Sequence, residues 1–208
     1  MDTAISLTHS PQYRTQLLRL AALTGAAEYL PLLLQAAETD PDTGYPLLVL
    51  YGQKSVMPEL LKALEIAHTM EQAAAAFSQL SDQILPRVPR LTVVGEEEEE
   101  DDDDDDAQQI PDVRAARAWW DKHQANWKPE ERWLFGKATN AAHLTAMCKK
   151  YAGSFGRDLI ALLALTQKAP LNIPTEIWRA RQIQLLAENP AAQSAANAAD
   201  QPAKAHHA

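Results

Sequence analysis

The chain has 208 residues, of which 46% are hydrophobic and 23% are charged, and this length can bury a core without disulfide staples. Its single cysteine, Cys148, excludes an intramolecular disulfide, and its first residues lack the charged-then-apolar pattern of a secretory signal peptide. Apolar stretches such as residues 159–165 are shorter than the roughly 20 residues that cross a bilayer. We therefore expect a cytoplasmic protein without a membrane span.

The formal net charge of −9 comes from one segment, the acidic run, in which residues 96–106 are all Glu or Asp. Outside the acidic run the chain carries 19 basic and 17 acidic residues, and 13 of the basic ones lie in residues 107–208. Direct nucleic-acid binding is disfavoured because the run adjoins this only basic block. Ala and Leu are abundant and Gly is scarce, which favours helix.

Two N-terminal segments match each other without a gap, at a constant offset of 27 residues. Residues 20–25 (Leu-Ala-Ala-Leu-Thr-Gly) match residues 47–52 (Leu-Leu-Val-Leu-Tyr-Gly), and Pro31 and Pro58 follow the two glycines at the same distance. Glycine ends helices in the left-handed conformation, and proline is tolerated in the first turn of a helix. Each copy therefore predicts a helical hairpin, and such hairpins stack to bury their apolar faces.

The paired leucines of these copies are the predicted core. We expect the following side chains to face inward: Leu20, Leu23, Leu33, Leu34, Leu47, Leu50, Leu60 and Leu61. A third helix of the same type is predicted over residues 70–80, where apolar side chains recur at helical spacing. The pattern fails at Pro86 and Pro89, so we place the hairpin repeats in residues 1–84.

Residues 85–110 are predicted to be a disordered linker, because they combine prolines with the self-repelling acidic run. Helical periodicity returns after Pro111, with Asp112 as a start signal. Later helices are predicted over residues 139–151, closed by Gly153, and over 157–167 and 175–187. The fold class is therefore all-α, with a small C-terminal helical bundle over residues 111–190 and a disordered tail over 191–208.

Several short motifs occur in a fixed order along the chain. They are Leu-x-x-Leu-Thr-Gly at residues 20–25, the acidic insert, Trp119-Trp120, Arg132-Trp133-Leu134-Phe135-Gly136, His143-Leu144 and Arg179-x-Arg181-Gln182. In these motifs, over about residues 15–188, the chain resembles a family of bacterial HEAT-repeat-like proteins often encoded near type VI secretion effector genes. The resemblance implies HEAT-like repeats and a protein partner that is an effector or a secretion component. Family members have more N-terminal repeats, so the chain corresponds to a shortened member or a C-terminal half.

Sequence signals for catalysis and cofactors are poor. The histidines are scattered without the His-Glu-x-x-His or Cys-x-x-Cys spacing of a metal site, and no glycine-rich phosphate loop occurs. Cys148 suits a small helix filler better than a nucleophile. The resemblance supplies no catalytic residues either, so we expect a non-enzymatic protein with no metal and no cofactor.

All five tryptophans follow the acidic run. Large aromatic residues at helical spacing favour a packed core, although tryptophan is also favoured in protein contacts. Neighbours on a helix diverge by about 100°, so Trp119 and Trp120 cannot both face one narrow core stripe. One of these two residues is therefore a candidate for partner contact.

The acidic run, which includes Glu96, Asp101 and Asp106, has two interpretations. It is either a solvated spacer or a phosphate-mimicking strip that occupies a basic partner surface and gives fast, salt-sensitive association. A calcium site is disfavoured because the run lacks the glycine turn of an EF-hand loop.

The functional expectation is a scaffold or adaptor that binds another protein. The alternative is an immunity protein that neutralises a toxic effector, such as a basic nuclease, by covering its active site. Both share one fold, so the sequence does not separate them. An enzyme acting on alkylated DNA would need a basic groove, which the charge distribution disfavours.

Overall fold

The computed structural model describes residues 11–90, 109–168 and 179–188 and divides into two compact units, Met1–Ala138 (unit 1) and Thr139–Ala208 (unit 2). The described residues are mostly helical, with two short two-stranded sheets, which confirms the all-α class. None of the helices in these ranges has the length and apolarity that a membrane crossing needs.

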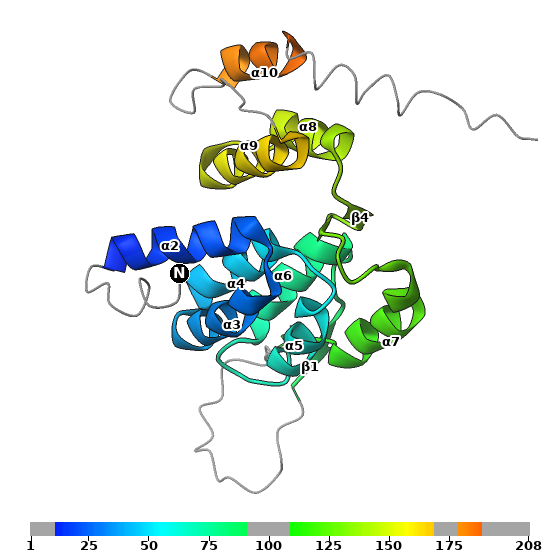
Figure 1. Cartoon of the computed structure of the whole chain (residues 1–208). Helices are drawn as coiled ribbons and strands as arrows, with labels where there is room; N and C mark the ends of the chain where they lie inside the picture. The colour runs from blue at the N-terminus through cyan, green and yellow to red at the C-terminus, as the bar shows by residue number, and fades with distance from the viewer. Residues whose placement is uncertain (1–10, 91–108, 169–178, 189–208) are drawn as a thin grey trace, which may run out of the picture. The chain divides into compact units, whose positions relative to one another are not determined.

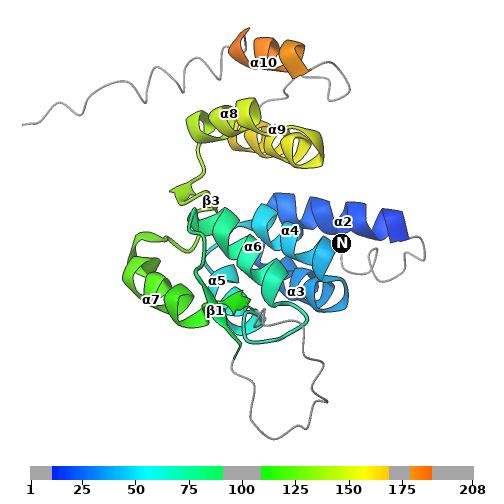
Figure 2. The same cartoon turned by 180° about the vertical axis from the view of Figure 1, so that it is seen from behind.

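Unit 1 contains two rows of helices (Figures 1 and 2). In the first row, α4 packs between α2 and α6; the bounds are α2 (Pro11–Thr24), α4 (Pro41–Tyr51) and α6 (Met70–Ser81). In the second row, α5 packs against α7; the bounds are α3 (Leu30–Thr39), α5 (Val56–Ala63) and α7 (Val113–His123). The two rows meet where α3 packs on α2 and α4, and where α5 packs on α6. Short 3-10 turns are η1 (Ala27–Tyr29) and η2 (Gln124–Asn126).

The helix ends follow local sequence signals. The predicted ends at Gly25 and Gly52 are confirmed, with φ of 69° and 61° in the left-handed region that glycine adopts without a steric penalty. Pro31 lies in the first turn of α3, as expected. The Asp112 carboxylate accepts hydrogen bonds from the N–H groups of Arg114 (2.8 Å) and Ala115 (3.1 Å) and so caps α7.

The core of unit 1 contains most of the leucines expected there, with one clear exception. Leu23, Leu33, Leu47, Leu50 and Leu60 are buried, whereas Leu34 and Leu61 are half-buried. The prediction for Leu20 is wrong, because its side chain is 52% exposed. The matching position in α4 is buried because α4 has a neighbouring helix on each side, whereas α2 packs on α3 and α4 only through its Leu18, Ala21 and Ala22 face.

Replacing Leu33 with Ala is expected to lower the free energy of unfolding by about 2–5 kcal/mol, because Leu33 is fully buried and its truncation leaves a cavity. The Leu20→Ala control removes the same atoms from an exposed position and should change it by less than about 0.5 kcal/mol. Urea unfolding followed by circular dichroism measures both, and equal losses would contradict the orientation of α2.

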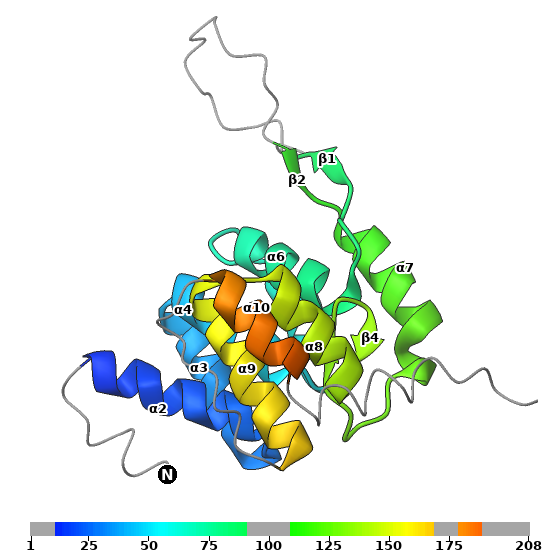
Figure 3. The same cartoon turned by 90° about the horizontal axis from the view of Figure 1, so that it is seen from above.

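The predicted linker is wrong at both of its ends. Strands β1 (Arg87–Pro89) and β2 (Gln109–Pro111) pair in an antiparallel ribbon, with Val88 opposite Ile110, and Figure 3 shows this ribbon projecting from the helices. Proline breaks helices and central strands, but a two-stranded ribbon consists only of edge strands, in which proline is tolerated. The acidic run and the predicted tail over 191–208 lie outside the described residues.

The predicted boundary near residue 110 also differs from the structure, because unit 1 continues to Ala138. α7 packs against α5, and its Trp119 meets Phe77 of α6 edge-on at 5.5 Å. The segment between α6 and α7, which carries the acidic run in sequence, therefore lies within unit 1 rather than between two units. The composition of the sequence reveals the acidic segment, but it does not predict that the helix after this segment packs on α5 before it.

Residues 132–136, here called the clasp, close unit 1 by binding the C-terminal ends of all three first-row helices. The Arg132 guanidinium donates to the carbonyl groups of Ala22 (3.2 Å) and Leu23 (2.9 Å) in α2, and to that of Tyr51 (3.0 Å) in α4. Backbone hydrogen bonds add Trp133 to Gly52 (2.7 Å), Phe135 to Gln79 (2.6 Å) and Gly136 to Leu80 (2.8 Å). Helix ends leave such carbonyl groups without helical partners, so the clasp satisfies acceptors in each helix.

The clasp is held in place by its own hairpin. Strands β3 (Trp133–Leu134) and β4 (Lys137–Ala138) pair across a turn in which Phe135 and Gly136 both have positive φ, 49° and 70°. Two-residue hairpin turns of type I′ require this backbone geometry. Leu134, the last residue of β3, is fully buried and anchors the turn to the core.

Unit 2 is a small helical unit in which α8 packs against both α9 and α10. The bounds are α8 (Ala141–Lys150), α9 (Gly153–Gln167) and α10 (Arg179–Glu188). Asn140 caps α8 by accepting from the His143 N–H at 2.8 Å. Gly153 begins α9 rather than closing the preceding helix, so α9 starts four residues earlier than its predicted start at Arg157.

Candidate partner-binding surfaces

A groove of about 460 Å³ lies in unit 1 beside α3, α4 and α5. Its walls are mainly apolar, from Leu34, Ala37, Leu48, Ala63 and Ile66. This volume is within the range of small-molecule sites and also suits an apolar side chain of a partner.

The polar groups of the groove include a tyrosine, a threonine and an ion pair. Burial raises the pKa of Tyr45, and the nearby Glu38 carboxylate raises it further, although a Thr69 hydrogen bond opposes both, so the phenol is neutral at physiological pH. The Thr69 hydroxyl donates to the Ala63 carbonyl at 2.9 Å and therefore stabilises the turn after α5. Lys62 is paired with Glu59 at 2.9 Å.

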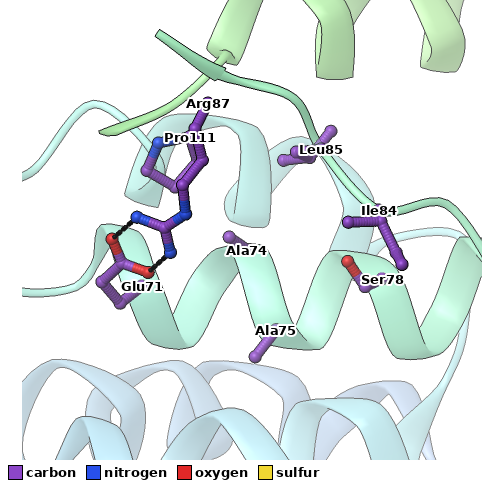
Figure 4. Close-up of a pocket in the computed structure, with 8 residues that line it drawn as sticks. All are labelled: Glu71, Ala74, Ala75, Ser78, Ile84, Leu85, Arg87 and Pro111. Carbon is purple, nitrogen blue, oxygen red and sulfur yellow. Dashed lines mark hydrogen bonds and ion pairs between the residues drawn. The ribbon is translucent and has the colours of Figure 1, made fainter. Parts of the chain in front are cut away.

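A second hollow, here called the ribbon pocket, has a volume of about 200 Å³ and lies at the base of the β1–β2 ribbon (Figure 4). The small residues of α6 form its floor, and apolar side chains form its walls: Ala74, Ala75, Ser78, Ile84, Leu85 and Pro111. Ile84 is 92% exposed, the highest value among the exposed large apolar side chains of the described residues.

One end of the ribbon pocket is formed by an ion pair that also links the ribbon to α6. The Arg87 guanidinium donates to both carboxylate oxygens of Glu71, at 3.0 and 2.6 Å, and to the Gln109 carbonyl at 3.0 Å. Glu71 raises the pKa of Arg87 through this hydrogen bond. The pair joins β1, β2 and α6, and its two charges cancel within the pocket.

The two candidate tryptophans occupy different environments. Trp120 is 6% exposed and meets Trp127 edge-on at 5.4 Å, and Trp127 in turn stacks on Trp133 at 4.5 Å. Trp120 is therefore a core residue and is not available for partner contact. Trp119 is half-buried, packs edge-on against Phe77 at 5.5 Å and stacks on His123 at 4.4 Å.

Glu96, Asp101 and Asp106, the other predicted contact residues, lie outside the described residues. The structure does describe where their segment begins and ends, because Pro89 and Gln109 are paired across the ribbon. The two tryptophans and the three acidic residues therefore all belong to unit 1. The structure describes no contact between the tryptophans and the acidic residues.

Cys148 is fully buried in α8, as expected for a helix filler. Within the described ranges, no group of three or more His, Cys, Asp or Glu side chains could hold a metal ion.

The ribbon pocket and the groove were missed by sequence reasoning. One local signal for the pocket was present: Ile84 and Leu85 follow the helix end at Asp82 and precede two prolines, so they are apolar residues outside a helix. Comparisons of the chain with protein-family models, curated proteins and solved structures give no match.

Proposed function

We propose that this chain is a non-enzymatic adaptor in which a HEAT-like stack of helical hairpins presents an acidic insertion to a basic surface of another protein. The observation that supports the proposal is the position of the eleven consecutive acidic residues between α6 and α7, both of which belong to unit 1. The paired ends at Pro89 and Gln109 and the Arg87–Glu71 ion pair hold the base of this insertion against α6.

Electrostatics supports binding rather than a structural role for the acidic run. It contains no apolar group that could be buried on folding, so its charges are expected to act on a partner. A dense negative field accelerates the encounter with a basic protein and makes association sensitive to salt. The sequence resemblance suggests that the partner is an effector or a component of a type VI secretion system.

Replacing residues 96–106 by Gln and Asn is expected to reduce the association rate constant by at least about tenfold at low salt. It should also flatten the dependence of that constant on ionic strength, because screening acts over about 8 Å at physiological salt. The partner is first captured with the full chain, identified by mass spectrometry and purified. Surface plasmon resonance at 50 and 300 mM salt then measures both rate constants.

The control variant replaces Arg117 with Gln, which removes an exposed pair with Glu65 in unit 1 but leaves the acidic run intact. It should retain the salt dependence. An unchanged association rate in the neutralised variant would make the run a spacer and refute the proposal.

Immunity is the second candidate, favoured by the same acidic run because a nuclease active site that binds nucleic acid is basic. Cells that produce a neighbouring toxin should then survive only when they also produce this chain, and the neutralised variant should not protect them. Binding without protection would support the adaptor.

A further inference from the structure

We propose that the groove beside α3, α4 and α5 binds a small organic amine, with its apolar body on the groove walls and its ammonium group beside the Glu38 carboxylate. This site goes beyond the proposed function, because every residue that lines the groove belongs to the described part of unit 1 and none belongs to the acidic run.

The groove is preformed, because α3 and α4 are in close contact beside it. A Cβ atom on Gly44 would lie 2.2 Å from the Ala37 Cα, so the two helices approach through their backbones at this point. Ala37, Tyr45 and Leu48, which line the groove from these helices, are buried and held by the core. The volume of about 460 Å³ lies within the roughly 300–1,000 Å³ of small-ligand sites, so an organic molecule fits without opening the fold.

The groove also exposes apolar surface that a ligand would cover. Ile66 lines the groove and is nevertheless 46% exposed, and Leu34 and Ala63 are half-buried. Removing such surface from water is favourable in proportion to the apolar area that is covered. The ligand therefore needs an apolar body.

The charges of the groove favour a cation. Glu59 is paired with Lys62 at 2.9 Å, whereas no cation pairs with Glu38 among the described residues. The lining thus carries two glutamates and one lysine, a net charge of −1 when His68 is neutral. Glu38 lies in the last turn of α3, and Ala63 is the last residue of α5, so the partially negative ends of two helix dipoles also adjoin the groove.

The hydrogen-bonding groups of the groove favour an ammonium group as that cation. Burial and then the Glu38 carboxylate raise the pKa of Tyr45, so the carboxylate lies close to a neutral phenol. The Thr69 hydroxyl already donates its proton to the Ala63 carbonyl at 2.9 Å. An ammonium group has three donors and no acceptor, and it can donate to the carboxylate and to the phenol oxygen together.

The test uses three probes that share one alkyl chain and differ in charge: hexylamine, hexanol and hexanoate. Titration of the isotope-labelled full chain, followed by the NMR shifts of its amide groups, measures each dissociation constant at low salt and about pH 8, where histidine is neutral. We expect hexylamine to bind about threefold to fivefold more tightly than hexanol, the factor that an exposed ion pair supplies, and hexanoate to bind more weakly than hexanol. The Ala63 and Thr69 amide groups should shift on binding.

Replacing Glu38 with Gln should make hexylamine and hexanol bind equally, because it removes the unbalanced charge and keeps the size of the side chain. The Glu28→Gln control removes an exposed carboxylate of η1, outside the groove, and should leave the preference for hexylamine unchanged. Replacing Ile66 with Ser should weaken hexylamine and hexanol by the same factor, since it removes apolar surface only.

Equal binding of hexylamine and hexanol to the wild-type chain, a preference for hexanoate, or shifts confined to residues outside the groove would each overturn the inference. If no probe binds, the groove belongs to a side chain of a partner. If Ile66→Ser abolishes a self-association seen in sedimentation, the groove belongs to a second copy. Both results also overturn the inference, and neither bears on the acidic run, so the adaptor proposal is tested separately.

Discussion

Replacing Arg132 with Met is expected to lower the free energy of unfolding of unit 1 by about 2–4 kcal/mol. The guanidinium donates to three carbonyl groups at the ends of α2 and α4, and hydrogen bonds from a charged donor contribute about 1.5–3 kcal/mol each. Its positive charge also lies at the negative ends of two helix dipoles. Burial lowers the pKa of Arg132 to about 10, so the side chain is still charged at neutral pH, and the cost of burying that charge offsets part of the gain.

Urea unfolding of the full chain measures the Arg132→Met effect, and hydrogen exchange of the last turns of α2 and α4 locates it. Arg132→Lys should be intermediate, because an ammonium group cannot reproduce the planar fork that spans two helix ends. The matched control is Arg117→Met, which removes an exposed ion pair with Glu65 and should cost less than about 1 kcal/mol. Equal losses in the two Met variants would refute the role of the clasp.

Replacing Gly44 with Ala is expected to lower the free energy of unfolding by about 2–3 kcal/mol, although Ala favours helix over Gly by about 1 kcal/mol. A Cβ atom on Gly44 would lie 2.2 Å from the Ala37 Cα and 2.3 Å from the Ala37 nitrogen. These are backbone atoms, so α3 and α4 must separate to accommodate the methyl group, and overpacking of this kind is destabilising.

The Gly44→Ala result is checked with a second substitution at Ala37. Because the clash involves the backbone, Ala37→Gly in the same chain should not restore stability. The Asp42→Ala control removes an exposed side chain in the same helical turn, together with its 3.0 Å hydrogen bond from Gln72 and its charge near the helix N-terminus, and should cost about 1 kcal/mol or less. A Gly44→Ala protein that is as stable as the wild type would mean that α3 and α4 do not approach this closely.

The candidate binding surfaces illustrate how far local sequence signals extend. The acidic run is visible in the sequence because charge is a property of composition. Helical periodicity predicts that Trp119 and Trp120 point in different directions, but only the packing of Trp120 on Trp127 assigns Trp120 to the core. The ribbon pocket depends on Arg87 reaching Glu71, a contact between residues 16 apart that no periodicity indicates.

The sequence by itself determined the helices of unit 1 and most of their ends, because capping residues, left-handed glycines and apolar periodicity act within a few residues of the chain. Gly25, Gly52 and Asp112 are examples. Only the tertiary structure decided that α7 packs on α5 within unit 1 and that Arg132 binds carbonyl groups about 110 residues earlier in the chain. Such contacts depend on which helix ends converge in space, and convergence follows from the packing of whole helices rather than from any local pattern.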